Sequence, residues 1–403
     1  MLRALRVAWG AAAARAAEAA AAGGAAGAAS AIWTFPSVLF SAFVIAWGAE
    51  AAQFFMSQGL ALALLAWLQT LPEFAVEADI AWRQDVPNML ANFTGSLRLL
   101  VGLGWPMIFF VASFAHKRKK GSWLKEIRLD PEHAVEVVGL LVPILYFFFI
   151  WGKASLTVWD GAFLTSAYLA YLWVLNRIPP RGEEETSDLD WVPRKVLGLR
   201  PGLRGGAICG LFVGGGLILY FVTHPFVDSL KAIALAAGIS EFVFIQWVAP
   251  FLSEFPEKVS AFKWASTVRQ APMALMNMVS SNINQWTVLA AMIPIVYSLS
   301  VGHMMAVPLD GMHRHEVLLT ILQSLLGMIL LLNMRYSAAE ALMIFVMWFV
   351  QFVVPSIRVE VMYGYGILIL GGVVQLFRGR RGISAFRIFA RQWRRNVARN
   401  AAT

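Results

Sequence analysis

Long apolar stretches, each about as long as a bilayer is thick, alternate with shorter polar segments along most of the chain. A helix needs roughly 20 predominantly apolar residues to cross the hydrocarbon core, and such stretches recur from residue 33 to residue 377. We therefore predict an all-α polytopic membrane protein with about ten to eleven spans. The predicted spans are 33–55, 59–82, 88–115, 133–151, 155–176, 205–227, 238–262, 272–300, 315–333, 337–355 and 360–377.

Composition agrees with this class and limits the alternatives. Of the 403 residues, 59% are hydrophobic and 14% are charged, whereas soluble domains contain about 25% charged residues. Much of the net charge of +9 comes from arginines after Phe377, directly behind an apolar stretch. We expect this tail to contact anionic membrane lipid, and we expect no nucleic acid as a partner. The single cysteine excludes an intramolecular disulfide and a cysteine-based metal site.

Lysine and arginine in the loops predict the orientation in the membrane. They gather in HKRKKGSWLKEIR after the third span, in the loop after the fifth span and in the C-terminal tail. Because basic loops stay in the cytoplasm, we place these three segments inside and the N-terminus outside. Arg3, Arg6 and Arg15 near the N-terminus argue against its placement outside. The predicted location is the plasma (bacterial inner) membrane.

Two segments of the chain share an unusual polar pattern. Pro72-Glu73 interrupts one apolar stretch and Pro256-Glu257 interrupts another. An Asn-x-x-[Gly/Ser]-Ser segment follows each about 19 residues later, at 92–96 and 277–281. Five predicted spans separate the two copies, so the copies enter the membrane from opposite sides. This is the inverted repeat on which many secondary transporters are built.

The acids inside these spans predict a cation site. A carboxylate at membrane depth is costly unless it is paired, solvated or coordinating, so it is functional by default. Each proline also removes a helical donor and frees the carbonyl four residues earlier, here that of Leu68 or Leu252. Glu73 and Glu257, brought together by the pseudo-twofold axis, would supply two carboxylates to one midplane site.

Nearby oxygens would complete this site with the hard ligands that calcium or sodium prefers. Four side chains offer hydroxyl or amide oxygens: Asn92, Ser96, Asn277 and Ser281. Glu254 lies one turn before Glu257, and Glu77 lies one turn after Glu73, so each acid pair shares a helix face. Two such acids should not both stay ionised without a cation, so we expect protons to compete for the site.

At these residues the sequence resembles the cation/calcium exchanger superfamily. The alpha-repeats of that group read roughly Gly-Thr-Ser-Leu-Pro-Glu and then Gly-Asn-x-x-Gly-Ser-Asn-Ile-x-Asn, and QTLPE, NFTGS, GISEF, SEFPE and NMVSSNI fall in register with them. The resemblance implies two inverted repeats of five transmembrane helices, with Glu73 and Glu257 as central ion ligands. It also implies that the following residues line the site: Thr70, Ser96, Ser253, Ser281 and Gln285.

The repeats divide the chain into five segments. They are an alanine-rich N-terminal segment (1–30), a first exchanger repeat (31–176), a cytoplasmic linker (177–204), a second exchanger repeat (205–357), and a possible extra span with a basic cytoplasmic tail (358–403).

The first repeat departs from the family pattern. The family's Gly-Ser-Asn-Ile-x-Asn reads GSLRLL here, so Leu97 and Leu100 replace two amides and Arg98 appears. Arg98 could occupy a cation's place, or it could pair with Glu77 or Glu254 on another helix face.

A structural alternative also exists for the two central acids. Glu73 and Glu257 could form interhelical ion pairs with Arg98 and with Lys258, which directly follows Glu257. Two Pro-Glu motifs would not be needed for such pairs, so we favour the cation site.

We expect a secondary cation antiporter that moves calcium against sodium or protons, with inorganic cations as its partners. No nucleophile-and-base set and no phosphate loop is evident in the sequence, so we expect neither an enzyme nor a cofactor. The alternative is an exchanger-fold protein that has lost transport and serves as a scaffold or regulatory subunit, which the altered first repeat favours. The sequence leaves the ion, the counter-ion and the oligomeric state open.

Overall fold

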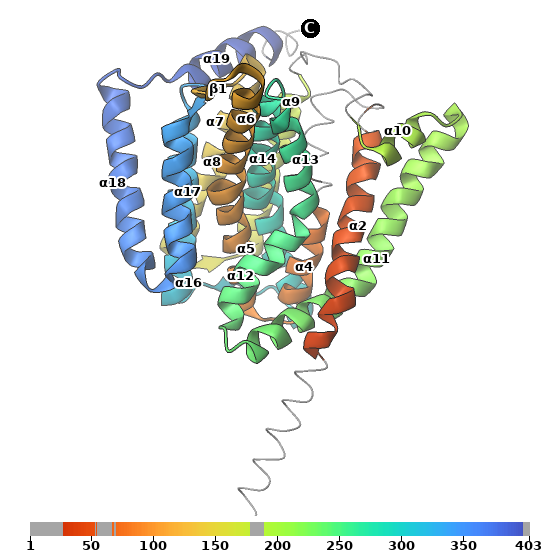
Figure 1. Ribbon diagram of the computed structural model, residues 1–403. Coiled ribbons are helices and arrows are strands. Elements are labelled where there is room, and N and C mark those ends of the chain that lie inside the picture. Colours follow the sequence, from red (N-terminus) through yellow and green to blue (C-terminus); the bar gives the residue numbers. More distant parts are fainter. Residues whose placement is uncertain (1–26, 53, 55–66, 68–69, 178–188, 398–403) are drawn as a thin grey trace, which may run out of the picture.

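The computed structural model describes residues 27–52, 54, 67, 70–177 and 189–397, which form a bundle of helices with two short strand pairs (Figure 1). The first half contains α2 (Ala31–Ala52), α4 (Leu71–Trp82), α5 (Val86–Leu99), the π-helical turn η2 (Leu100–Gly104), α6 (Trp105–Lys120), β1 (Glu126–Arg128), η3 (Pro131–His133), α7 (Ala134–Gly139), α8 (Leu141–Lys153), β2 (Ser155–Leu156) and α9 (Val158–Leu175).

The second half follows the short helix α10 (Trp191–Leu197). It contains α11 (Pro201–Ala236), α12 (Glu241–Ser253), α13 (Phe255–Ser266), α14 (Ala271–Asn284), the π-helical turn η5 (Gln285–Leu289), α15 (Ala290–Val301), β3 (Val307–Pro308), α16 (Gly311–Leu331), β4 (Arg335–Ser337) and α17 (Ala338–Val353). The chain ends in η6 (Pro355–Ile357), α18 (Arg358–Phe377), α19 (Ser384–Gln392) and η7 (Trp393–Val397).

The described helices confirm an all-α polytopic membrane protein. Eight of them are long and apolar enough to cross a membrane, and Glu241–Ser253 and Ala338–Val353 are shorter apolar helices. Part of the predicted second span (59–82), namely residues 59–66, 68 and 69, lies outside the described residues. The total of ten to eleven spans therefore stays a prediction.

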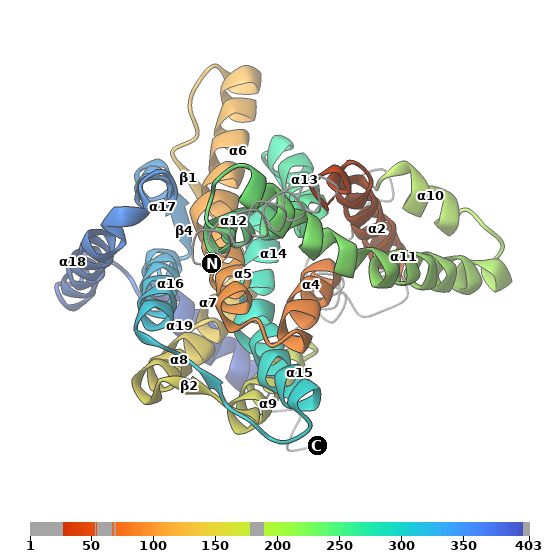
Figure 2. The same ribbon diagram turned by 90° about the horizontal axis from the view of Figure 1, so that it is seen from below.

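Burial separates central helices from peripheral ones. The most apolar part of Val86–Lys120 and that of Gly311–Leu331 are each 72% buried, but those of Pro201–Ala236 and Pro355–Phe377 are only 17% buried. Figure 2 agrees: α5 and α14 lie in the middle, α11 and α2 lie on one side, and α18 lies on the other. The polar segments with the predicted site residues thus run through the centre, away from lipid.

The two halves are related by matching local features. The π-helical turns η2 and η5 begin four residues after Ser96 and Ser281, at equivalent positions of the repeat. Capping boxes start α9 at Thr157 and α17 at Ser337, each directly after a strand. The strands pair across the halves, β1 with β4 and β2 with β3, both antiparallel. These pairs tie the loops of one half to the loops of the other.

Candidate functional site

Both Pro-Glu motifs lie where a new helical segment begins. In the second half α12 ends at Ser253, and α13 starts at Phe255 with Pro256 in its first turn. Pro72 likewise lies in the first turn of α4. A proline is tolerated there because the first-turn N–H groups have no helical partner. Glu73 therefore lies in the first turn of α4 and Glu257 in the first turn of α13, where the helix dipole favours a negative charge. Leu68, whose carbonyl is predicted to be free, lies outside the described residues.

Glu73 is completely buried and receives hydrogen bonds from both halves of the protein. Ser96 Oγ on α5 donates to Glu73 Oε1, and Gln285 Nε2 at the start of η5 donates to Glu73 Oε2 at 2.7 Å. The first carboxylate is therefore fixed by one residue of its own repeat and one residue of the other.

Glu257 is also completely buried but is bound by its own repeat. Ser281 Oγ donates to Glu257 Oε1 at 2.5 Å, and Asn277 Nδ2 donates to the same oxygen at 3.3 Å. Within the described part of the chain, Glu257 Oε2 has no hydrogen-bond partner. One oxygen of this carboxylate is thus available to a ligand.

Gln285 joins a third acid to this group. Its Nε2 donates at 2.9 Å to Glu254 Oε1 as well as to Glu73, so one amide holds two carboxylates. Ser281, which binds Glu257, lies one turn before Gln285 on the continuous α14–η5 helix. This helix face therefore gathers three acids at a π-helical turn, a feature often found at functional sites.

The gathered groups form an oxygen-rich, completely enclosed cluster. Glu73, Glu254 and Glu257 are each 0% exposed. Carboxylate, hydroxyl and amide oxygens of this kind are the ligands of calcium, which takes six to eight of them. Chemically, the cluster can bind a hard cation or hold protons in its place.

Comparison with known proteins now identifies the family. The family model described as "Sodium/calcium exchanger protein" matches residues 26–176 and 207–356, once in each half and over most of the chain. The chain belongs to the sodium/calcium exchanger protein family. A search of curated proteins found no match.

Solved structures agree with this exchanger fold. A structure titled "Crystal Structure of H+/Ca2+ Exchanger CAX" is 32% identical, with a TM-score of 0.82 and 91% coverage of both chains. A structure of the sodium-calcium exchanger NCX_Mj soaked with Na+ and Sr2+ is 20% identical, with a TM-score of 0.54, and covers 81% of this chain and 98% of its own. The predicted fold of two inverted repeats is thereby confirmed, and the second similarity concerns the fold alone.

Three of the predicted site residues, Thr70, Ser253 and Asn92, donate their hydrogen bonds to groups other than Glu73, Glu254 and Glu257. The hydroxyl of Thr70 donates to the carbonyl of Trp67 at 2.8 Å, and that of Ser253 donates to the carbonyl of Ala249 at 3.0 Å. Backbone bonding of this kind is a common alternative for hydroxyls in or near helices. Both residues are buried beside the break, but their hydroxyl protons point to the backbone rather than to an acid.

Asn92 departs from its predicted role as a neighbour of Glu73. Its Nδ2 donates at 2.6 Å to Glu77 Oε2, one turn further along α4. Its counterpart Asn277 binds Glu257, so the two repeats differ here. The reason is that the first repeat carries a second acid one turn after the Pro-Glu motif, where the second repeat has Ala261.

The structural alternative, in which Arg98 and Lys258 form ion pairs with Glu73 and Glu257, is wrong. Lys258 pairs with Glu254 instead of Glu257, because residues four apart share a helix face. Arg98 pairs with none of Glu73, Glu77 and Glu254: its guanidinium bonds to Glu316 at 2.5 Å. Arg98 thus lies on the face of α5 away from Ser96, and its guanidinium does not enter the acid cluster.

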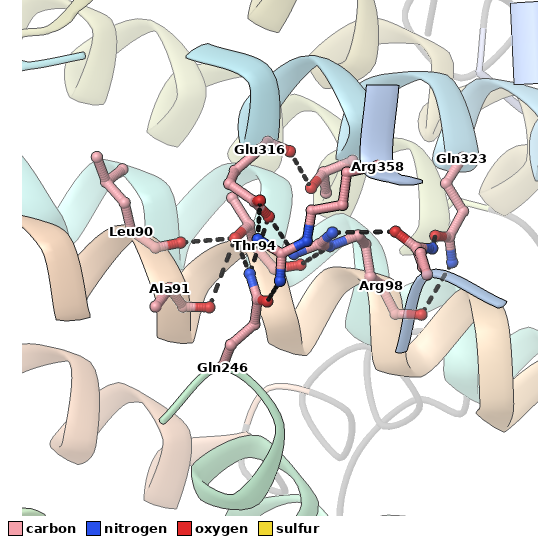
Figure 3. A network of polar contacts seen from close by, with 10 residues as sticks. Leu90, Ala91, Thr94, Arg98, Gln246, Glu316, Gln323 and Arg358 are labelled. Atoms are coloured by element: carbon pink, nitrogen blue, oxygen red, sulfur yellow. Dashed lines mark hydrogen bonds and ion pairs between the residues drawn. The ribbon is translucent and has the colours of Figure 1, made fainter. Parts of the chain in front are cut away.

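Sequence reasoning missed the polar network around Arg98 (Figure 3). Glu316 on α16 also binds Arg358 on α18 at 2.5 Å, and Gln246 on α12 donates to Glu316 at 2.9 Å. A signal existed, because three glutamines lie inside otherwise apolar stretches: Gln246, Gln323 and Gln351. Buried glutamines require partners, and here they find them in this network.

Proposed function

We propose that the chain is a secondary active antiporter that exchanges calcium for protons across the membrane. The observation that carries this proposal is the convergence of Glu73, Glu254 and Glu257 on one face of the α14–η5 helix. The site would be built on the two Pro-Glu motifs, and transport would need neither a cofactor nor enzymatic chemistry.

Calcium fits the chemistry of the cluster. Three buried carboxylates and one ammonium group, that of Lys258, leave an excess of negative charge that a divalent cation would balance. Glu257 Oε2 and Gln285 Oε1 lack partners among the described side chains and are therefore free to act as ligands. The neighbouring structure at 32% identity is titled as an H+/Ca2+ exchanger, which supports the same cation.

Protons fit better than sodium as the counter-ion. When calcium leaves, the carboxylates remain buried together. Ionised carboxylates at such short distances repel one another. Proton uptake removes this repulsion without any additional ligand. Sodium would need further oxygens, but the first repeat offers the apolar side chains of Leu97 and Leu100 where the family has amides, and both are completely buried.

Uptake of calcium into proteoliposomes tests the proposal. Purified protein is reconstituted, and radioactive calcium uptake is followed under an imposed pH gradient and, separately, under a sodium gradient. We expect uptake that the pH gradient drives and that a protonophore abolishes. Glu257→Gln serves as the site variant and should give no uptake, whereas Glu241→Gln, at an exposed position of α12, should match the wild type. Uptake driven by the sodium gradient alone would show that the counter-ion is sodium rather than the proton.

The runner-up function is that of a membrane scaffold or regulatory subunit that has lost transport. Lys258 carries this alternative, because its ammonium group binds Glu254 inside the cluster and supplies a positive charge where a cation would bind. Calcium uptake absent under both gradients would favour the scaffold. Expression in the plasma membrane with all spans inserted would be expected of either function.

A further inference from the structure

A charge cluster of three residues lies buried behind α5, on the side away from the acids. It consists of Arg98 on α5, Glu316 on α16 and Arg358 at the start of α18 (Figure 3). Arg98 binds Glu316 Oε2 and Arg358 binds Glu316 Oε1, both at 2.5 Å. The side chains of Arg98, Glu316 and Arg358 are 0%, 3% and 13% exposed.

The other described groups that hydrogen bond to this charge cluster are neutral. Gln351 accepts from Arg98 at 3.0 Å, Gln246 accepts from Arg358 at 3.0 Å, and the backbone carbonyl of Thr94 accepts from Arg98 Nε at 3.2 Å. Among the described residues, both guanidiniums form ion pairs with Glu316 only. Two positive charges thus share one negative charge, and one positive charge remains unbalanced inside the membrane-spanning bundle.

This excess charge is close enough to act on the acids. Ser96, which binds Glu73, and Arg98 are two residues apart on α5, so they point about 200° apart around its axis. A helix with its side chains is roughly 10–12 Å wide, so charged groups on its two sides are at least about that far apart. Buried charges at that separation still interact appreciably, because the effective dielectric constant inside proteins is about 20 rather than 80.

We propose that the net positive charge of Arg98, Glu316 and Arg358 sets the affinity of the exchanger for its cation, and that Arg358 supplies the excess charge that lowers this affinity. A positive charge behind the site opposes cation binding and favours release, which a transporter needs as much as binding. Arg358 belongs to α18, which begins after residue 356, where the second family match ends. The last long helix would therefore tune the transport site, in addition to carrying the basic tail. This inference rests on the proposed function.

Substitutions that change the charge in opposite directions separate an electrostatic role from a structural one. Arg358→Gln makes the charge cluster neutral, and Glu316→Gln raises its net charge to two. We expect the KM for calcium uptake to fall by at least about tenfold in the first variant and to rise by a similar factor in the second. A merely structural role would impair transport in both variants, with KM unchanged or moving the same way.

Three further variants complete the test. The double variant Glu316→Gln with Arg358→Gln restores the net charge of one, so its KM should return to within about threefold of the wild type, even if the maximal rate is reduced. Arg358→Lys keeps the charge and should also keep the KM. Glu360→Gln changes an exposed acid of the same helix and should leave both parameters unchanged. If Glu316→Gln fails to fold, the comparison of Arg358→Gln with Arg358→Lys decides alone.

The outcomes distinguish this inference from the proposed function. A wild-type protein without calcium uptake would contradict the proposed function. A wild-type protein with uptake, but with equal KM values in Arg358→Gln, Arg358→Lys and the wild type, would overturn the role of the charge cluster and leave the function standing.

Discussion

Three buried acids of the exchanger have different hydrogen-bond partners, and this difference predicts different roles. Glu73 and Glu257 receive bonds from serine and amide groups of the central helices, which position them without neutralising them. Glu254 already pairs with the ammonium group of Lys258. Its charge is therefore partly balanced by the protein, whereas the other two acids depend on a bound cation or proton.

Glutamine substitutions test these roles. We predict that Glu73→Gln or Glu257→Gln abolishes calcium uptake, because each removes a carboxylate that the protein does not balance. Glu254→Gln should retain uptake with a pH optimum shifted to lower pH, because one negative charge fewer attracts protons less strongly. The measurement is initial uptake into proteoliposomes between pH 5 and pH 9. Full activity of both Glu73→Gln and Glu257→Gln would show that these carboxylates are structural.

The sequence could predict those site residues that recur in the repeats. Glu73 with Ser96 and Glu257 with Ser281 follow from the motif spacing, and the structure brings each pair into contact. It could not predict that Arg98 turns to Glu316, 218 residues away, because the direction of a side chain depends on which helices pack around it. Whether these residues bind a cation stays a prediction.

At the scale of elements, the close approach of α5 and α12 determines how the two repeats meet. A Cβ atom on Gly95 would lie 1.8 Å from the backbone carbonyl oxygen of Gln246. A backbone carbonyl inside a helix cannot move away, so only glycine fits at this crossing. Ser96, the next residue, is thereby placed against Glu73.

Gly95→Ala should therefore destabilise the exchanger. Overpacking typically costs about 1–3 kcal/mol, and contact with backbone places this site at the upper end. We expect a clearly lower midpoint of thermal unfolding in detergent, measured by fluorescence-detected gel filtration. Gly214→Ala is the matched control, because nothing lies within 4 Å of the added Cβ and alanine is favoured in helices by up to about 1 kcal/mol. Equal midpoints of thermal unfolding for Gly95→Ala and Gly214→Ala would contradict the close contact between Gly95 and the backbone of α12.

An ion pair at the start of α5 gives a pH-dependent prediction. Burial would raise the pKa of Asp85, but hydrogen bonds with Lys231 and Asn88 outweigh burial and lower it. The folded protein thus binds fewer protons here than the unfolded chain, so the stability from this pair is complete above the ordinary aspartate pKa of about 3.9 and is lost as the pH falls through the lowered value.

Lys231→Gln should remove this contribution, which is about 0.2–1 kcal/mol for a partly exposed pair. We expect the unfolding midpoint to fall by the same amount at pH 7 and pH 5.5 relative to the wild type, with the difference shrinking below about pH 4. Lys120→Gln, at an exposed position, should show no difference at any pH. A difference that grows on acidification would contradict the pairing with Asp85.

Element boundaries were predictable where the pattern was strong. The apolar stretches predicted the ends of most long helices to within about five residues, but α11 continues to Ala236, well beyond the predicted end at residue 227. The prolines predicted the break before α13. The capping boxes at Thr157 and Ser337 correspond to the sequence patterns Thr-x-x-Asp and Ser-x-x-Glu, which indicate the first turn of a helix. The π-helical turns were not predictable, because the hydrophobic period changes too little over five residues to reveal them.

At the scale of the whole molecule, the basic segments gather at one end. Figure 1 shows β1, which follows the lysine-rich end of α6, together with α10 and α19 toward the same end of the bundle, while α2 begins at the opposite end. The strand pairs that join the two halves also agree with inverted repeats. The positive-inside rule predicts that this basic end faces the cytoplasm.

This arrangement predicts that the two termini lie on opposite sides of the membrane. A protease-cleavable tag at the C-terminus should be cut only in inside-out vesicles, because we expect the arginine-rich tail after Phe377 to lie at the cytoplasmic surface, against anionic lipid. A tag at the N-terminus should be cut only in right-side-out vesicles, because an odd number of predicted spans separates the two ends. A cytoplasmic control protein establishes that each preparation is sealed. Cleavage of the C-terminal tag only in right-side-out vesicles would show that the predicted orientation is wrong. Cleavage of both tags in the same vesicles would show that an even number of spans separates the termini, so that the prediction of eleven spans is wrong.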